Sequence, residues 1–368
     1  MGERESAVGQ AVNLWEFYSG KKVLLTGHTG FKGGWITIWL RLLGAEVIGF
    51  ALPPDTEPNL FTAADVARGI VSIFGDVRDL RTVKQTFDQH RPEIAIHNAA
   101  QPLVRRSYRD PVGTYSTNVM GTVNVLEAAR SNASVRSVVV ITSDKCYENR
   151  EWERGYKEDD ILGGHDPYSS SKGAAELVAA AYRRSFSAGG DSAAIATARA
   201  GNVIGGGDWA EDRLIPDIVR GIASGAPVII RRPDSIRPWQ HVLEPLSGYL
   251  LLAQKLYEAG ANYAEAWNFG PKADDSITAA DLASRVCARW GKGELRIQSD
   301  PNAPHEATYL RLDCTKAVQR LAWSSRLRLD RALQWTVDWY RAFYERPSEP
   351  PRAVTEGQIR AYMQAKTA

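Results

Sequence analysis

The chain lacks the features that mark several protein classes. Its 368 residues include three cysteines, Cys146, Cys287 and Cys314, too few and too widely spaced for a disulfide framework or a metal-binding knuckle. No apolar run approaches the roughly 18 residues of a membrane span, and the first 20 residues contain no apolar stretch typical of a secretory signal. The six histidines form no pair at metal-ligand spacing. We therefore expect a cytoplasmic protein without a metal site.

An excess of charge of one sign is also missing. The chain has 45 Lys plus Arg against 43 Asp plus Glu, a formal net charge of +2. This balance argues against nucleic acid or a membrane surface as a partner, because both need a broad basic field. The apolar content of 44% and charged content of 24% are ordinary for a soluble globular protein and exclude disorder.

Residues 20–200 alternate between short, continuously apolar runs and segments with helical spacing. Continuous apolar strands are typical of a parallel sheet covered by helices on both faces. The pattern predicts an α/β fold with a doubly wound (Rossmann) sheet. The expected strands are 22–26, 46–52, 69–74, 94–97, 135–142 and 192–199, and the expected helices include 35–43, 81–90, 111–131 and 167–185.

After residue 200, glycines and prolines separate shorter elements. This change predicts two main units: a cofactor-binding domain over 20–200, and a smaller, discontinuous substrate lobe over 201–345. We expect some segments of the second unit to return to the first. A Trp-rich helix is expected over 331–344, and residues 346–368 are expected to form a polar tail.

The first strand runs into the sequence GHTGFKG, with glycines at 27, 30 and 33. At a strand-to-helix junction, such glycines permit a tight turn and let the backbone approach a pyrophosphate, which the helix N-terminus then binds. The loop therefore predicts a dinucleotide site. The second strand ends without the usual ribose-binding acid, since Asp55 is displaced by a few residues, but no arginine takes its place to bind a 2′-phosphate. NAD is favoured over NADP.

The pair of Tyr168 and Lys172 points to hydride transfer. Tyr168 and Lys172 lie four apart in a predicted helix, so they share one face. The cation favours the phenolate and makes the tyrosine a usable general base near neutral pH. Downstream of the third strand, Asp76 either approaches the adenine amino group or caps a helix.

The glycine loop, Asn98-Ala99-Ala100, Asn118, Ser143 and the Tyr168–Lys172 pair together resemble the extended short-chain dehydrogenase/reductase family. The resemblance implies that tyrosine exchanges a proton with a substrate hydroxyl, that lysine lowers the tyrosine pKa and binds the nicotinamide ribose, and that serine orients the reacting oxygen. It implies these cofactor-binding residues: Gly27, Thr29, Gly30, Phe31, Lys32, Gly33, Asp76, Val77, Asn98, Ala99, Ala100, Asn118, Tyr168 and Lys172.

The residues Asp144 and Lys145 help to distinguish which reaction of this family the chain is expected to catalyse. Losing water from a sugar requires an acid for the leaving hydroxyl and a base for the C5 proton, and Asp144 can serve as that acid. Thymidine- and guanosine-linked 4,6-dehydratases are similar here but carry glutamate in place of Lys145. The lysine, with GHTGFKG, SDKCY and GGHDPYSSSK, resembles members that act on CDP-glucose. Lys145 is then either the C5 base or a stabiliser of the enolate.

The implied reaction has three steps: oxidation at C4 with Tyr168 as base, loss of water across C5 and C6 with Asp144 as acid, and return of hydride to C6. The product is CDP-4-keto-6-deoxyglucose, and NAD is recycled. The alternatives are a 4,6-dehydratase or epimerase acting on another nucleotide sugar, and a non-catalytic NAD-sensing regulator. Intact Tyr168 and Lys172 argue against the regulator.

The resemblance also implies the substrate contacts and the assembly. The expected substrate-binding residues are Ser143, Asn202, Leu214, Arg237, His241 and Arg311. A surface salt bridge is an open alternative for each arginine. The helices beginning at Pro111 and Pro167 are expected to pair in a homodimer, with a homotetramer as the alternative.

Overall fold

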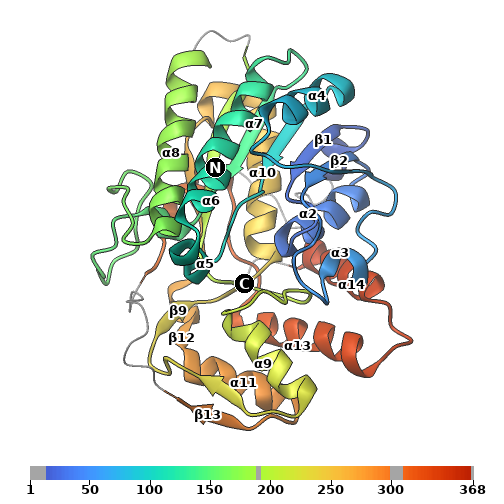
Figure 1. Ribbon diagram of the computed structural model, residues 1–368, viewed down its shortest axis with the longest axis vertical. Coiled ribbons are helices and arrows are strands. Elements are labelled where there is room, and N and C mark those ends of the chain that lie inside the picture. Colours follow the sequence, from blue (N-terminus) through green and yellow to red (C-terminus); the bar gives the residue numbers. More distant parts are fainter. Residues whose placement is uncertain (1–13, 188–191, 299–309, 366–368) are drawn as a thin grey trace, which may run out of the picture.

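The computed structural model describes residues 14–187, 192–298 and 310–365. A seven-stranded parallel sheet lies at its centre, in the order β11-β6-β5-β4-β1-β2-β3 (Figure 1). The chain crosses from β3 to β4 on the far side of β1, so the direction of winding reverses between β1 and β4. The strands are β1 Lys22–Thr26, β2 Glu46–Ala51, β3 Val71–Phe74, β4 Ile94–His97, β5 Ser137–Ile141, β6 Ala194–Ala200 and β11 Ala266–Phe269. The predicted doubly wound sheet is confirmed.

Helices cover both faces of the sheet because successive strand residues point to opposite sides. Leu24 of β1 packs with the helices α4 (Leu80–His90), α7 (Gly121–Arg130) and α8 (Pro167–Phe186). Val23 and Leu25 pack on the other side with α2 (Phe31–Leu42) and α10 (Leu243–Ala259). This two-sided burial explains why the strands read as continuous apolar runs.

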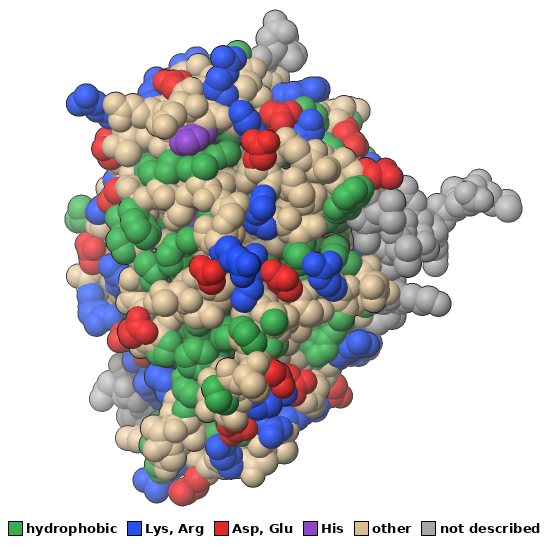
Figure 2. Space-filling view, turned by 90° about the vertical axis from the view of Figure 1, so that its right-hand side faces the viewer, with side chains coloured by type: hydrophobic (Ala, Val, Ile, Leu, Met, Phe, Trp, Pro, Cys, Tyr) green, Lys and Arg blue, Asp and Glu red, His purple; other side chains and the backbone are tan. Residues whose placement is uncertain are grey.

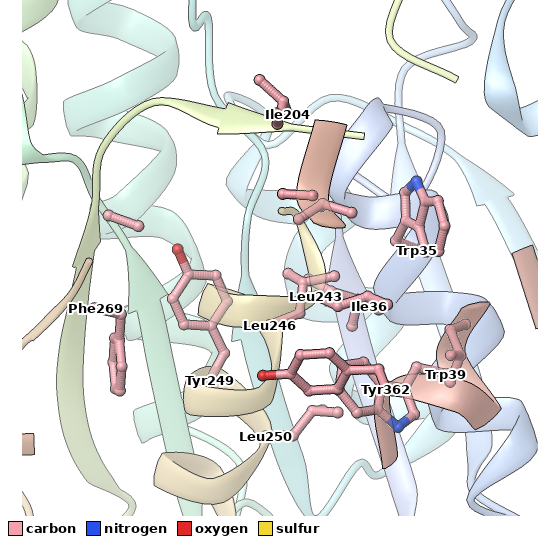
Figure 3. Close-up of a cluster of buried hydrophobic side chains, with 14 of the residues drawn as sticks. Trp35, Ile36, Trp39, Ile204, Leu243, Leu246, Tyr249, Leu250, Phe269 and Tyr362 are labelled. Carbon is pink, nitrogen blue, oxygen red and sulfur yellow. The ribbon is translucent and has the colours of Figure 1, made fainter. Parts of the chain in front are cut away.

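The hydrophobic core on the side of the sheet covered by α2 and α10 contains several tryptophans. Figure 3 shows Trp35 and Trp39 of α2 beside leucines of α10, with Tyr362 lying against them. The rings of Trp39 and Tyr362 meet edge to face, with centroids 5.6 Å apart. Tyr362 belongs to α14 (Pro351–Gln364). The expected polar tail is therefore a docked helix whose inner face is apolar.

The second lobe lies below the sheet in Figure 1 and contains α9 (Leu214–Ser224), α11 (Ala279–Trp290) and α13 (Leu329–Glu345). Three two-stranded sheets accompany these helices. They pair β7 (Val203–Ile204) with β10 (Gln240–His241), β8 (Val228–Ile230) with β13 (Leu295–Ile297), and β9 (Ile236–Pro238) with β12 (Ser276–Thr278). Between these segments the chain returns to the main sheet through α10 and β11, so the segments of this lobe are not contiguous in the sequence.

The predicted helix over 111–131 is interrupted. It consists of α6 (Pro111–Tyr115), a π-helical turn η1 (Ser116–Met120) and α7. Such turns often occur at functional sites, and this one contains Asn118. The remaining short helices are α3 (Leu60–Ala63), α5 (Val104–Arg109), α12 (Thr315–Leu321) and the 3₁₀ turns η2 (Asp144–Cys146), η3 (Gly260–Asn262) and η4 (Ala273–Asp275).

The face shown in Figure 2 carries Lys and Arg interspersed with Asp and Glu. No helix in the described part of the chain has the length and apolarity needed to cross a membrane. Within the same residues, no group of three or more His, Cys, Asp or Glu side chains could hold a metal ion.

Candidate active site

The glycine loop joins β1 to α2 at the carboxyl edge of the sheet. Gly27 has a left-handed backbone (φ +79°), and a Cβ there would lie 2.8 Å from the backbone nitrogen of Ala99. At Gly33, a Cβ would lie 1.9 Å from the carbonyl oxygen of Gly27. Both positions therefore require glycine for close packing. Helix α2 begins after Gly30 with no side-chain cap and no acidic residue in its first turn, which leaves its N-terminus suited to an anion.

His28 points away from this loop and into the sheet. Its ring is completely buried, and its Nε2 lies 2.7 Å from the Ser72 hydroxyl. Burial lowers the pKa of His28 to about 4, so the ring is neutral at pH 7. The side chain supports β2 and β3 beneath the loop and adds no charge to the site.

A second group of predicted cofactor residues lies after β4. The Thr26 hydroxyl accepts hydrogen bonds from the backbone N–H groups of Asn98 and Ala99, each at 3.1 Å. The Asn118 amide accepts from the Gln101 N–H at 2.8 Å and donates to the Ser171 hydroxyl at 2.8 Å. Asn118 thus fastens the loop after β4 to helix α8.

The helix-cap interpretation of Asp76 is wrong, because Asp79 caps α4 by accepting from the N–H groups of Arg81 and Thr82. Asp76 instead pairs with Arg78, whose Nε lies 2.8 Å from one carboxylate oxygen. The other interpretation, a contact with adenine, stays a prediction. Val77 packs closely on Gly121, where a Cβ would lie 2.8 Å from a Val77 methyl group.

The predicted acid lies in a tight turn after β5. Ser143 caps the 3₁₀ turn η2 by accepting from the Lys145 N–H at 3.2 Å, and its hydroxyl donates to the Asp144 carboxylate at 3.0 Å. Both Ser143 and Asp144 are buried, whereas Lys145 is half-buried. A Cβ on Gly201 would lie 2.4 Å from the Asp144 carboxylate, so glycine there makes room for the acid.

Tyr168 and Lys172 face the same region from α8. Burial raises the pKa of Tyr168 to about 12; the neighbouring Asp144 adds to the rise, while a hydrogen bond with Ser143 opposes it. Burial lowers the pKa of Lys172 to about 8, and its ammonium group donates to the Ile141 carbonyl at 3.3 Å. The structure thus brings together the predicted catalytic residues of β5 and α8.

Positive charges surround the Asp144 carboxylate. Burial raises its pKa, and the opposing influences come from Lys145, the Ser143 hydroxyl, Lys32 and Arg237. Lys32 lies in the first turn of α2 beside the glycine loop, and burial together with nearby cations lowers its pKa to about 8. Arg237 belongs to the second lobe, so the site spans both lobes.

Of the other predicted substrate-binding residues, some lie near the junction of the lobes and others do not. Asn202 precedes β7 and Leu214 begins α9, both half-buried near the junction of the lobes. His241 is not brought to the site: it is fully buried, with its ring between Trp35 and Trp335 at 5.7 and 5.6 Å. Arg311 donates to the carbonyl of Glu153 at 3.2 Å.

Comparison with known proteins gives the family. Residues 24–336 match the family model described as GDP-mannose 4,6 dehydratase. The chain belongs to this family. The CDP-glucose 4,6-dehydratase of Salmonella typhimurium is 49% identical over 355 residues, covering 95% of this chain and 98% of the relative. The dTDP-glucose 4,6-dehydratase of Streptomyces niveus is 28% identical, over 90% of this chain and 97% of the relative.

Solved structures share the fold. The dTDP-glucose 4,6-dehydratase DesIV of Streptomyces venezuelae, with NAD and TYD bound, has a TM-score of 0.75 at 24% identity, over 88% of this chain and 99% of its own. The epimerase Mth375 of Methanothermobacter thermautotrophicus has a TM-score of 0.78 at 22% identity, covering 91% and 96%. At these identities the likeness shows the fold of the family, which dehydratases and epimerases share.

Sequence reasoning missed several residues near the site. Arg213 precedes α9 and pairs with Asp208 at 2.8 Å, and its charge opposes the rise in the pKa of Tyr168. Arg199, near the end of β6, is buried in an ion pair with Glu176. The motif of Tyr168 and Lys172 does not reveal that Glu176 pairs with a distant arginine, although Glu176 lies one turn beyond Lys172 and therefore on the same helix face.

Proposed function

We propose that this protein is an NAD-dependent 4,6-dehydratase that converts CDP-glucose to CDP-4-keto-6-deoxyglucose. The observation that carries the proposal is the meeting of two buried groups in one site: Ser143 and Asp144 after β5, and Tyr168 and Lys172 on α8. The identity of 49% to a CDP-glucose 4,6-dehydratase over nearly the whole chain supports the choice of substrate.

The glycine loop fits NAD. The N-terminus of α2 presents backbone N–H groups without a competing side-chain cap, as a pyrophosphate requires. We assign cofactor binding to this loop, to the segment 98–100 and to Asn118, with Asp76 and Val77 near the adenine. When bound, the nicotinamide supplies a hydride acceptor for C4 and a hydride donor for C6, so no cofactor is consumed.

Tyr168 takes the proton from the O4 hydroxyl. Its phenol is a weak acid in its buried setting, with a pKa near 12, so it needs a stabilising charge. Lys172, with a pKa of about 8, keeps its proton at pH 7 and supplies that charge. Ser143 orients the same substrate oxygen, and its hydrogen bond favours the phenolate.

Asp144 protonates the departing C6 hydroxyl. Because burial raises the pKa of this carboxyl, it holds a proton more readily than an exposed aspartate and can act as an acid. Lys145, next in the turn and half-buried, is assigned to the removal of the C5 proton. The carbonyl at C4 acidifies that proton before it leaves.

The second lobe binds the nucleotide part of the substrate. Arg237 supplies a positive charge close to Asp144, where a diphosphate next to the sugar would lie. Asn202 and Leu214 lie at the junction of the lobes, and Arg311 immediately precedes Leu312, which forms a β-bridge with Tyr156. The local donors explain how a chain of net charge +2 can bind two anionic ligands.

The protein is further proposed to form a homodimer in the cytoplasm. Large apolar side chains are exposed along α6, η1 and α8, including Val112 at 79% and Leu177 at 61% exposure, and such a patch is typical of an interface. Isologous packing of this face on a second copy would cover it. The three cysteines are free thiols, as expected in a reducing compartment.

One assay tests the proposed reaction. The protein is incubated with CDP-glucose and NAD, and alkali-induced absorbance of a 4-keto sugar is measured. We expect product with the native chain and a loss of about 100-fold or more with Asp144→Asn, the effect of removing a general acid. An epimerase would give no keto sugar and would tolerate Asp144→Asn, and a regulator would give no product from any nucleotide sugar.

A further inference from the structure

A buried ion pair lies directly behind the catalytic turn. Glu176 of α8 and Arg199 of β6 meet at 2.8 Å, and both side chains are only 3% exposed. Two guanidinium nitrogens of Arg199 donate to the two carboxylate oxygens of Glu176, at 2.9 and 2.8 Å. This bidentate geometry fixes the guanidinium plane, and the reaction described above assigns the pair no role.

The carboxylate of Glu176 also joins two strands to α8. It accepts a hydrogen bond from the hydroxyl of Thr142, the residue just before Ser143. It accepts a second from the Thr197 hydroxyl of β6 at 2.7 Å. Glu176 therefore connects the start of the catalytic turn to the helix that carries Tyr168 and Lys172.

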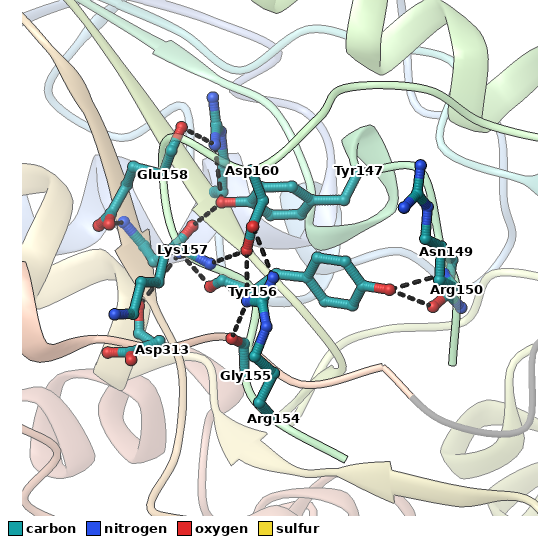
Figure 4. A network of polar contacts seen from close by, with 12 residues as sticks. Tyr147, Asn149, Arg150, Arg154, Gly155, Tyr156, Lys157, Glu158, Asp160 and Asp313 are labelled. Atoms are coloured by element: carbon teal, nitrogen blue, oxygen red, sulfur yellow. Dashed lines mark hydrogen bonds and ion pairs between the residues drawn. The ribbon is translucent and has the colours of Figure 1, made fainter. Parts of the chain in front are cut away.

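Arg199 holds the other end of the turn. Its remaining nitrogen donates to the Tyr147 hydroxyl at 2.7 Å and to the Glu158 carbonyl at 3.1 Å. The Tyr147 hydroxyl in turn donates to Asn268 at 2.8 Å (Figure 4). Residues 143–146 are thus tied down on both sides, at Thr142 through Glu176 and at Tyr147 through Arg199.

The pair also sets the charge around Lys172. Besides Tyr168, which Lys172 is proposed to assist, the titratable groups that interact electrostatically with Lys172 are Glu176 on its own helix, Cys146 in the turn, His97 of β4 and Lys32 of α2. Burial keeps His97 neutral at pH 7 and raises the pKa of the Cys146 thiol, so that it is also neutral. Of these groups, Glu176 supplies the negative charge that favours the protonated lysine.

We propose that the Glu176–Arg199 ion pair is a positioning device, which holds the Ser143–Asp144 turn in register with Tyr168 and keeps Lys172 protonated. Neither residue touches the reacting atoms; both act through Thr142, Tyr147 and Lys172. The inference rests on the proposed dehydratase function, because it concerns how that site is held in place.

The test compares four variants. The single substitution Glu176→Gln would leave the buried Arg199 without a counter-charge, and an unpaired buried charge strongly destabilises a protein. The decisive variant is therefore the neutral double substitution Glu176→Gln with Arg199→Met. Thr142→Val removes the tie to the turn and keeps the ion pair, and Thr142→Ser restores the hydroxyl. Glu244→Gln is the matched control, since Glu244 is also a fully buried carboxylate but bonds to residues 326, 327 and 362.

For the double variant we expect kcat to fall about tenfold or more with KM changed by less than about twofold, the pattern of a lost transition-state interaction. Losing the carboxylate lowers the pKa of Lys172 further, so the alkaline limb of the kcat–pH profile moves to lower pH. We expect Thr142→Val to reduce kcat without shifting the pH profile, and Thr142→Ser to restore kcat. The control Glu244→Gln should change neither kcat nor the pH profile. A double variant with native kcat and pH profile would overturn the proposal.

A second readout does not depend on catalysis. The rate at which acetic anhydride acetylates Lys172 is followed by mass spectrometry from pH 6 to 10, where the midpoint reports the lysine pKa. We expect a lower midpoint in the double variant than in the native chain or Glu244→Gln. An unchanged midpoint refutes the charge role. If the native protein makes no keto sugar while this midpoint shifts, the dehydratase proposal fails and the electrostatic role of Glu176 stands.

Discussion

The buried carboxylate of Glu244 makes the stability of this protein depend on pH in an unusual direction. Glu244 lies at the start of α10 with no exposed surface. It accepts hydrogen bonds from the N–H groups of Arg326 and Leu327, at 3.0 and 2.6 Å, and from the Tyr362 hydroxyl at 3.0 Å. Burial nevertheless dominates and raises its pKa from 4.5 to about 7.

The direction in which pH changes the stability follows from proton linkage. A raised carboxyl pKa means that the folded state binds the proton more tightly than the unfolded state between pH 4.5 and about 7. The free energy of unfolding contributed by this group is therefore greatest at low pH and is lost as the pH rises through 7. A change from 4.5 to 7 corresponds to about 3 kcal/mol, as an order of magnitude.

Urea denaturation of the native chain and Glu244→Gln, at several values between pH 5 and 8, measures this contribution. The difference between the two proteins removes the titration of all other groups. Because glutamine cannot ionise, we expect the free energy of unfolding of Glu244→Gln to increase relative to that of the native chain as the pH rises, by up to about 3 kcal/mol. Two parallel curves across this range would refute the reasoning, because they would mean that Glu244 has the same pKa in both states.

Three further substitutions test the site and the surface. Tyr168→Phe should lower kcat by about 100-fold or more without changing the melting temperature, because it removes only the general base; near-native turnover would exclude that role. Gly33→Ala should cost about 1–3 kcal/mol in urea unfolding, whereas Gly30→Ala, whose nearest neighbour is 3.6 Å away, should be tolerated; equal losses would contradict the packing argument. Leu177→Glu should convert a dimer to monomers in light scattering, and an unchanged mass would place the interface elsewhere.

Much of the sheet could be predicted from the sequence, because burial on both faces leaves a direct signal in each strand. The predicted runs 22–26 and 94–97 coincide with β1 and β4. The helix over 111–131 was not predicted correctly in detail. Its π-helical turn contains Asn118, whose side chain bonds to Gln101 and Ser171 from distant parts of the chain. Such tertiary bonds can override local helical preference, and helical periodicity does not reveal them.

The C-terminal helix was missed for a different reason. Residues 346–368 are mostly polar, but Thr355, Ile359 and Tyr362 recur at helical spacing and are completely buried. Average composition conceals a narrow apolar stripe of this kind. The residues that receive the stripe come from separate parts of the chain: Trp39 of α2 and Glu244 of α10 contact Tyr362, and Trp339 of α13 contacts Thr355. Only the folded structure could identify these partners together.

For the candidate site, the sequence indicated which residue types take part but not how their charges are balanced. Tyr168, Lys172 and Asp144 follow from spacing within one helix and one turn. Glu176 and Arg199 could not be paired in advance, because they lie 23 positions apart and are separated by the end of α8 and most of β6. In the sequence, nothing distinguishes Arg199 from the other arginines, whereas in the fold it pairs with the buried carboxylate of Glu176.

The same argument explains why the net charge of +2 says little about the ligands. Two cations lie at the candidate site: half-buried Lys32 and buried Lys172 both have pKa values lowered to about 8. Each costs free energy to bury, and an anionic ligand placed between them would raise their pKa values again. Binding of a dinucleotide or nucleotide sugar should therefore be accompanied by proton uptake near pH 8, measurable by calorimetry in buffers of different ionisation enthalpy. Charge in this protein is organised around the site, at a scale that whole-chain composition cannot resolve.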